Sequence, residues 1–345
     1  MRTVIPVVIV AGFLGSGKTT LLNHLLRNNR GTRIGVVVND FGAVNIDAML
    51  VAGQVDAMVS LGNGCVCCAV DVSELDDLFG RLAQPRSAVD VIVVEASGLA
   101  EPRNLIRMVI ATPNPRIAYG GLVEVVDAEL FDSTSARHPE LVTHLRLADL
   151  VLVNKADRVA PEALAALRAR ITDWVGQVPV YATTHGRVDP GLLFDERVRE
   201  EPTVAQQLSF DALLDDHDHD HDDPDHRHLH DEYLSVSFTS KRALDPRALV
   251  AFLEDPPPGL FRAKGCVAFA VAGERRKFEL HVVGRHVVFT PGTWARGEER
   301  VSSLVLIGAG LEPDAALDRL HATVFDGDEP LDEQAMLGVW RYTPR

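Results

Sequence analysis

Gly12-Phe13-Leu14-Gly15-Ser16-Gly17-Lys18-Thr19 is the stretch that decides the fold. It matches the pattern G-x-x-x-x-G-K-[ST], in which glycines let backbone N–H groups close around a phosphate. An apolar run at residues 4–10 precedes this stretch, and a segment with leucines at helical spacing, at positions 21, 22, 25 and 26, follows it. The sequence therefore predicts a phosphate-binding loop between a buried strand and a helix.

Similar apolar runs recur downstream, and helix-length segments lie between most of them. We predict further buried strands at residues 34–38, 89–94, 121–126, 150–153 and 179–181. This alternation indicates an α/β fold: a P-loop NTPase parallel sheet with helices on both faces. We assign residues 1–205 to this domain.

The composition changes sharply after this domain. Residues 215–232 hold nine carboxylates, six histidines and one arginine, so they cannot fold by burial, and we interpret residues 206–232 as a flexible linker. Residues 233–345 are predicted to form a smaller C-terminal α+β domain. Its expected elements are strands at 233–238, 266–271, 277–283 and 304–307, a helix beginning at Asp245-Pro246, and a helix over 313–324.

Composition narrows the class of protein. The 345 residues suit two domains, and the net charge of −15 argues against a nucleic-acid partner. Uncharged apolar runs of about 18 residues are absent, so we expect no membrane span. The N-terminal apolar run lacks a small-residue cleavage site, which argues against a signal peptide. Three of the four cysteines fall within four residues, which favours reduced thiols in the cytoplasm.

Phosphate and magnesium binding are predicted from the loop and from a later strand end. Lys18 would meet the β- and γ-phosphates, Thr19 would offer its hydroxyl to Mg²⁺, and Thr20 would lie near the α-phosphate. Glu95 ends a buried strand and is placed to hold the magnesium shell, while the N–H of Gly98 can reach the γ-phosphate. Helix capping is the alternative role for the Glu95 carboxylate. The remaining predicted phosphate contacts are Gly12, Gly15, Ser16 and Gly17.

Asn154-Lys155-Ala156-Asp157 follows the strand at 150–153, where a P-loop protein presents side chains to the base. A carboxylate at Asp157 can accept the N1 and N2 hydrogens of guanine, which adenine does not supply. We therefore predict GTP rather than ATP, with Asn154, Lys155 and Asp157 at the base. Thr183 is a candidate for a second guanine contact.

Cys65, Cys67 and Cys68 lie behind the glycine-rich turn Gly62-Asn63-Gly64, so their thiols can converge on one ion. Thiolates suit zinc, copper or cobalt, and Asp40, a water or a client residue could complete the shell. Asp47 is the alternative carboxylate. A redox role for the adjacent thiols and simple burial are the other interpretations. Cys266, within an apolar run, is expected in the core.

The linker histidines alternate with aspartates and would capture Zn²⁺, Ni²⁺ or Co²⁺ weakly and multivalently. They are His217, His219, His221, His226, His228 and His230. A solvated spacer is the plain alternative. The scattered His24, His144 and His185 are expected to be structural.

Taken together, Gly12 to Thr20, the CxCC turn at Gly62 to Cys68, Glu95 to Gly98 with Glu101-Pro102, and Asn154 to Asp157 resemble the CobW-type family of metal-associated GTPases. The C-terminal part resembles that family's second domain, notably at 262–265 and 304–308. The resemblance implies coupling of GTP hydrolysis to metal delivery in zinc homeostasis, cobalamin biosynthesis or activation of metalloenzymes such as nitrile hydratase. Glu95 agrees with the family, whereas Asp40 stands where the family usually has glutamate.

The leading hypothesis is a GTP-hydrolysing metallochaperone that carries zinc, or alternatively cobalt, to a client metalloprotein. Its cofactors would be GTP and Mg²⁺. A homodimer is compatible with the sequence. A non-enzymatic zinc buffer that uses the linker is the main alternative. A small-molecule kinase would explain neither Asn154 to Asp157 nor the thiols.

Overall fold

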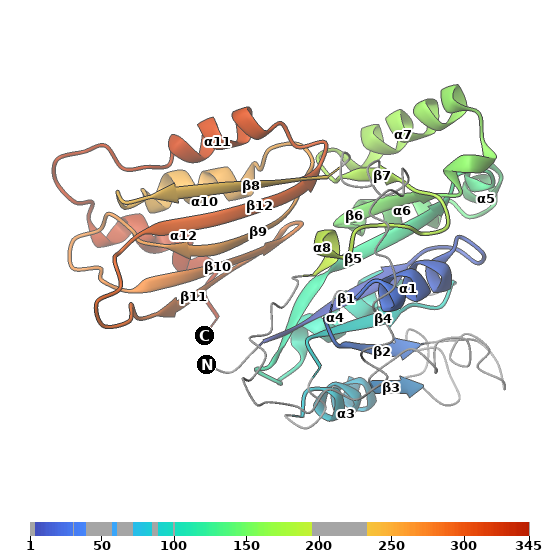
Figure 1. Ribbon diagram of the computed structural model, residues 1–345, viewed down its shortest axis with the longest axis horizontal. Helices are drawn as coiled ribbons and strands as arrows, with labels where there is room; N and C mark the ends of the chain where they lie inside the picture. Colours follow the sequence, from blue (N-terminus) through green and yellow to red (C-terminus); the bar gives the residue numbers. More distant parts are fainter. Residues whose placement is uncertain are drawn as a thin grey trace, which may run out of the picture.

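The computed structural model describes residues 4–29, 31–38, 57–60, 72–84, 89–98, 101–194 and 233–344. Within these residues two sheets lie side by side, each with its own helices (Figure 1). None of the helices in this part of the chain is long and apolar enough to cross a membrane.

The first sheet has seven parallel strands in the order β3-β2-β4-β1-β5-β6-β7. This order places β1, which leads into the phosphate loop, at the centre, between β4 and β5. The strands are β1 Ile5–Ala11, β2 Ile34–Val38, β3 Ala57–Ser60, β4 Val91–Glu95, β5 Ile117–Asp127, β6 Leu150–Asn154 and β7 Val180–Ala182.

Both faces of this sheet are buried, as the continuous apolar strands predict. In β1, Val7 and Ile9 enter one core, while Val8 and Val10 enter the core on the opposite face, because successive strand side chains point to opposite sides. The helices are α1 Lys18–Arg27, α3 Val72–Leu82, α4 Pro102–Ala111, α5 Phe131–Arg137, α6 Glu140–Leu147, α7 Pro161–Val175 and α8 Pro190–Leu193, with a 3-10 turn η1 at Ala156–Arg158. Helices α1 and α8 contribute to one core, and α3 to α7 contribute to the other.

The second sheet is antiparallel, in the order β11-β10-β9-β12-β8. Its strands are β8 Tyr233–Ser240, β9 Leu260–Val267, β10 Lys277–Val283, β11 His286–Gly292 and β12 Ser302–Ala309. Its helical segments are α10 Pro246–Glu254, α11 Pro313–His321, the 3-10 helix η3 Glu333–Met336 and α12 Leu337–Arg341, which pack into one core with the strands. The predicted P-loop sheet and the separate α+β domain are thus confirmed.

Individual elements depart from the predictions in the second domain. The strand expected at residues 266–271 is instead β9, which ends at Val267, because Phe269 and Val271 form isolated bridges to Leu244 and Leu331. Strand β11 was not anticipated, and neither was β3 at the edge of the first sheet. The helix start at Asp245-Pro246 is confirmed, since the Asp245 carboxylate accepts hydrogen bonds from two N–H groups of the first turn.

The two domains share a packed junction at the amino-terminal ends of β5 and β6. Gly121, in a bulge of β5 with φ of 110°, lies so close to the second domain that a Cβ there would meet Val283 at 2.6 Å and the Phe261 ring at 3.4 Å. Phe261, Val283 and Ile307 of the second domain belong to the same buried cluster as α1. The junction is therefore a continuous hydrophobic core.

A buried carboxylate also crosses this junction. Asp149 accepts hydrogen bonds from the Tyr119 hydroxyl and from the Leu122 N–H within the first domain, at 2.5 and 2.9 Å. It also accepts one from the Arg285 backbone, in the turn between β10 and β11. Burial raises the pKa of Asp149 and that of Tyr119. Three donors from two domains thus converge on one side chain.

Candidate functional site

The phosphate loop has the backbone conformation that its glycines predict. Gly12, Gly15 and Gly17 have φ of 142°, 74° and 105°, values that side chains other than glycine rarely adopt. A Cβ at Gly12 would lie 2.3 Å from the Val125 carbonyl oxygen, so the loop also needs glycine for its close approach to β5. Gly17 is the N-cap of α1, and the loop therefore closes at a helix N-terminus, which attracts phosphate.

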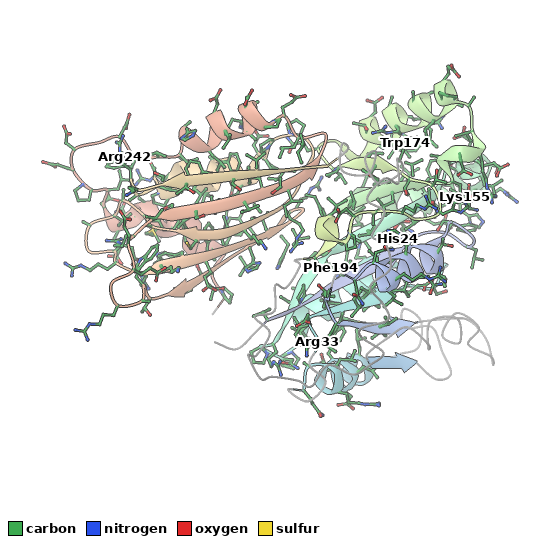
Figure 2. The ribbon with its side chains drawn as sticks, viewed as in Figure 1. His24, Arg33, Lys155, Trp174, Phe194 and Arg242 are labelled. Carbon is green, nitrogen blue, oxygen red and sulfur yellow. The ribbon has the colours of Figure 1, made fainter. Side chains whose placement is uncertain are left out.

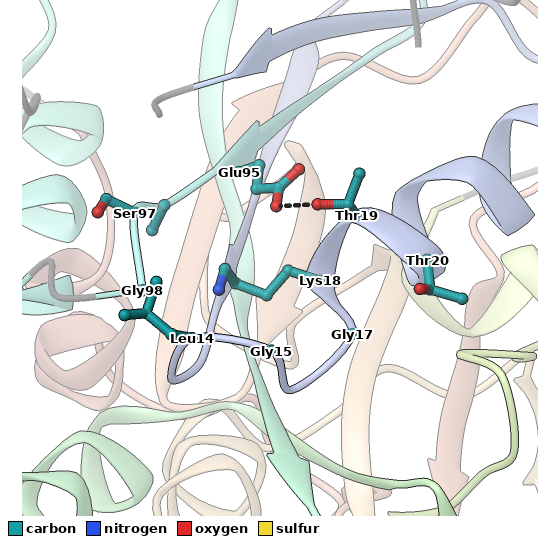
Figure 3. A pocket seen from close by; sticks show the side chains of 10 residues that line it. Leu14, Gly15, Gly17, Lys18, Thr19, Thr20, Glu95, Ser97 and Gly98 are labelled. Atoms are coloured by element: carbon teal, nitrogen blue, oxygen red, sulfur yellow. Dashed lines mark hydrogen bonds between the residues drawn. The ribbon is translucent and has the colours of Figure 1, made fainter. Parts of the chain in front are cut away.

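Beside the loop lies a cavity of about 290 Å³, which Figure 3 shows from close by. The Thr19 hydroxyl donates a 2.7 Å hydrogen bond to Oε1 of Glu95, at the end of β4. The Lys18 Nζ donates to the carbonyl oxygens of Gly12 and Phe13, at 3.0 and 3.2 Å. The predicted magnesium ligand, the strand-end carboxylate and the phosphate lysine thus lie around one cavity.

Gly98 and Thr20 also line this cavity, Gly98 through its backbone and Thr20 at its exposed margin. A Cβ at Gly98 would lie 2.8 Å from the backbone nitrogen of Leu14, so the turn after β4 packs directly on the loop. The Thr20 side chain is exposed and points away from Glu95 (Figure 3). This orientation separates Thr20 from the Thr19 and Glu95 pair.

Thr19 and Glu95 are a donor set that fits Mg²⁺, since this ion prefers hydroxyl, carboxylate and phosphate oxygens and binds few protein groups. Their side chains are already in contact, between the first turn of α1 and the end of β4. Bound there, Mg²⁺ would neutralise charge on the phosphates, and Lys18 would add a second positive charge from the loop.

Asn154 ties the two halves of the nucleotide site together. Its Nδ2 donates to the Ser16 carbonyl oxygen and its Oδ1 accepts from the Gly186 N–H, both at 2.9 Å. The side chain is only 2% exposed. A Cβ at Gly17 would lie 2.2 Å from Nδ2, so the last loop glycine makes room for this amide. Asn154 thus organises the site through backbone contacts.

The predicted base-binding residues surround the end of β6. Lys155 has φ of 61°, and its Nζ lies 2.6 Å from the Asp127 carboxylate at the end of β5 (Figure 2). Asp157, in η1, is exposed, as a carboxylate that receives a base must be. The Thr183 backbone bonds to both Val153 and Ala156, and its hydroxyl donates to the Arg187 carbonyl oxygen. These contacts place Thr183 beside the segment that is predicted to bind the base.

The predicted transition-metal ligands fall outside the residues that the structure describes. They are Cys65, Cys67, Cys68, Asp40, His217, His219, His221, His226, His228 and His230, together with the alternative Asp47. The linker boundaries at 205 and 232 lie there too. In the described part of the chain, His, Cys, Asp and Glu form no group of three or more that could hold a metal.

The other singled-out residues have structural surroundings. His24, labelled in Figure 2, lies on α1. Its Nε2 is 2.8 Å from the Val188 carbonyl oxygen, and burial lowers its pKa. His144 is buried 3.4 Å from Glu101, whereas His185 is exposed with φ of 55°. Cys266 is half-buried instead of lying in the core, because it shares a face of the sheet with its cross-strand neighbours Glu279 and Ser303, while the next residue, Val267, enters the core from the other face.

Two acidic residues of β5 were missed by sequence reasoning. Asp127 contacts Lys155, and its position at the carboxyl end of a parallel strand was a usable signal. Glu124 lies in the same strand and is 3% exposed. A carboxylate inside an apolar run at 121–126 was the only signal for it.

A glycine cradle at a helix N-terminus, a lysine beneath it, and a threonine in the first turn of that helix that contacts a strand-end glutamate define a P-loop nucleotide-binding protein. The sequence profile of the CobW/HypB/UreG nucleotide-binding domain matches residues 6–182, and that of the cobalamin synthesis protein CobW C-terminal domain matches residues 233–337. The chain belongs to this CobW/HypB/UreG family.

Named relatives span one or both domains. The zinc chaperone YjiA of Escherichia coli K12 is 34% identical over 219 residues, which cover 61% of this chain and 68% of YjiA. The zinc chaperone CobW of Sinorhizobium is 28% identical over 348 aligned residues, covering 91% of this chain and 95% of that protein. A crystal structure of zinc-bound YjiA GTPase from E. coli aligns with 94% of this chain and 100% of its own, at 24% identity and a TM-score of 0.44.

Proposed function

We propose that this chain is a GTP-hydrolysing metallochaperone that binds a transition metal, with zinc favoured, and passes it to a client protein. The observation that carries the nucleotide part is the Thr19–Glu95 contact beside Lys18. Relatives named zinc chaperones support the metal part.

Guanine selection rests on Asp157. Its carboxylate is exposed one turn beyond Asn154, whose amide fixes the segment to the phosphate loop. Asp157→Asn tests this role: an amide can donate to the 2-oxo group of xanthine, whereas a carboxylate accepts from the N1 and N2 hydrogens of guanine. We expect the variant to lose GTP affinity and gain xanthosine triphosphate affinity. Unchanged preference, or wild-type protein that prefers ATP, would contradict the proposal.

Metal delivery is assigned to Cys65, Cys67 and Cys68, whose thiolates suit zinc. If nucleotide and metal sites are coupled, GTP must tighten zinc binding by the same factor by which zinc tightens GTP binding. Zinc titration with a non-hydrolysable GTP analogue and with GDP measures this factor. Equal zinc affinities in the two states would remove the switch, although not the binding site.

The zinc buffer is a second candidate, favoured by the six linker histidines. Deleting residues 215–232 discriminates between the two functions. A buffer would lose most of its bound zinc, whereas a metallochaperone would keep a tight site that Cys65→Ser and Cys67→Ser together abolish.

A further inference from the structure

Glu124 is a buried carboxyl group beside the phosphate loop that the proposed function does not use. It faces Ala11, the last residue of β1, on one side and Val151 of β6 on the other. It is 3% exposed, and no described residue donates a hydrogen bond to its Oε2. This buried oxygen therefore lacks the hydrogen bond that buried polar atoms normally have.

Glu124 lines a second cavity, of about 150 Å³, between the phosphate loop and α5 and α6. The loop contributes Phe13, Leu14 and Ser16 to its wall, so the carboxyl group and the loop share one space. The lining is mostly apolar, including Phe131, Leu141 and Leu145 from the two helices. Ionising a carboxyl group in such a wall is costly.

Lys18 is the positive charge that acts on this carboxyl group. Its Nζ is bonded to the carbonyl oxygens of Gly12 and Phe13, and its side chain is buried. Burial raises the pKa of Glu124 to about 8, and the charge of Lys18 acts in the opposite direction. The carboxyl group therefore holds its proton near neutral pH and would attract Lys18 once ionised.

Other charges around the second cavity have partners of their own. Asp127, further along β5, contacts Lys155, and His144 of α6 contacts Glu101. On α5, the guanidinium of Arg137 donates to the Ser133 carbonyl oxygen, while after α5 His138 contacts Glu140. Titration of Glu124 would thus act chiefly on Lys18.

We propose that Glu124 is a positioning residue for Lys18: ionised, it competes with nucleotide phosphates for the lysine, and protonated, it releases the lysine to them. The inference rests on the proposed nucleotide-binding function. Bound phosphates interact with Lys18 and so weaken the attraction between Lys18 and the ionised Glu124 carboxylate. Above the pKa of Glu124, nucleotide binding is therefore accompanied by uptake of a proton from solvent. Nucleotide affinity should then fall as pH rises, by up to about tenfold per pH unit.

The test compares full-length wild-type protein with Glu124→Gln, an isosteric change that cannot ionise. The dissociation constant of GDP with Mg²⁺ is measured from about pH 6.5 to about pH 9.5, spanning the shifted pKa. Titration of the nucleotide itself is common to both proteins and cancels in the ratio. We expect similar affinities at the acid end and about tenfold or more tighter binding by Glu124→Gln at the alkaline end.

Calorimetry in buffers of different ionisation enthalpy counts the protons taken up and provides a readout that loss of packing would not change. At about pH 8.5 we expect uptake by the wild type beyond that of Glu124→Gln. Glu124→Asp, which restores an ionisable group, should restore a pH-dependent affinity. Parallel pH profiles with equal proton uptake would overturn the inference and leave GTP binding intact. Failure of the wild type to bind guanine nucleotides at any pH would overturn the proposed function instead.

Discussion

Replacing Asn154 by alanine should separate the phosphate loop from the base-binding segment. The amide satisfies two buried backbone groups, the Ser16 carbonyl and the Gly186 N–H, each at 2.9 Å. Leaving a buried polar group unpaired costs about 1 to 3 kcal/mol, so the loss of two such bonds in Asn154→Ala should lower the free energy of unfolding of the first domain by about 2 to 6 kcal/mol. Nucleotide affinity should fall as well, by about tenfold or more, because binding must then order both segments.

Urea unfolding followed by tryptophan fluorescence measures the stability loss. Trp174 lies on α7 in the first domain, whereas Trp294 and Trp340 lie in the second. A Trp294→Phe and Trp340→Phe background therefore lets the signal report on the first domain alone. Asn104→Ala, at a half-buried position of α4, is the matched control. A loss below about 0.5 kcal/mol with unchanged nucleotide affinity would refute the bridging role.

Three further predictions follow from the junction, the magnesium pair and the buried carboxyl group. Gly284→Ala should destabilise the protein by about 3 kcal/mol, because its Cβ would lie 1.7 Å from Oδ1 of Asp149. Gly273→Ala, also at positive φ but with open space around it, should cost only about 1 kcal/mol. Equal losses of unfolding free energy in urea would contradict the close approach of Gly284 to Asp149. Glu95→Gln should raise the Mg²⁺ concentration that half-saturates nucleotide binding by about ten- to a hundredfold, measured by magnesium titration. An unchanged titration would count against Glu95 as part of the magnesium site. The pKa of Glu124 is raised in the folded state, so its contribution to stability is present below about pH 4.5 and is lost as pH rises to about 8, by about 1.4 kcal/mol per pH unit. Glu124→Gln should flatten this dependence when the free energy of unfolding is measured by urea denaturation at several pH values. Wild-type and variant slopes that coincide would show that the pKa of Glu124 is not raised.

Local patterns predicted the architecture of the first domain except for its edge strand β3. A strand, a glycine loop and a helix are adjacent in sequence, and β1, the loop and α1 follow the pattern within one residue at the start of β1. The contact of Thr19 with Glu95 joins residues that are 76 positions apart, yet it agrees with the prediction because the phosphate loop leads from the carboxyl end of β1 into α1, and Glu95 ends the neighbouring parallel strand β4. In the second domain β9 was misplaced and β11 was missed, because pairing between antiparallel strands, which local composition does not reveal, selects the residues that form each strand.

The sequence by itself determined the class of site, because loop conformation, helix N-terminus and phosphate chemistry are encoded in consecutive residues. Only the tertiary structure decided that Asn154 binds backbone groups at Ser16 and Gly186, since that role depends on three segments meeting. It also decided that Glu124 is buried beside the phosphate loop and that Asp149 joins the two domains. The sequence pattern around a carboxylate in an apolar run is the same whether the carboxylate faces solvent, a lysine or another domain. Packing of distant elements sets its solvation and neighbouring charges, and these determine what it does.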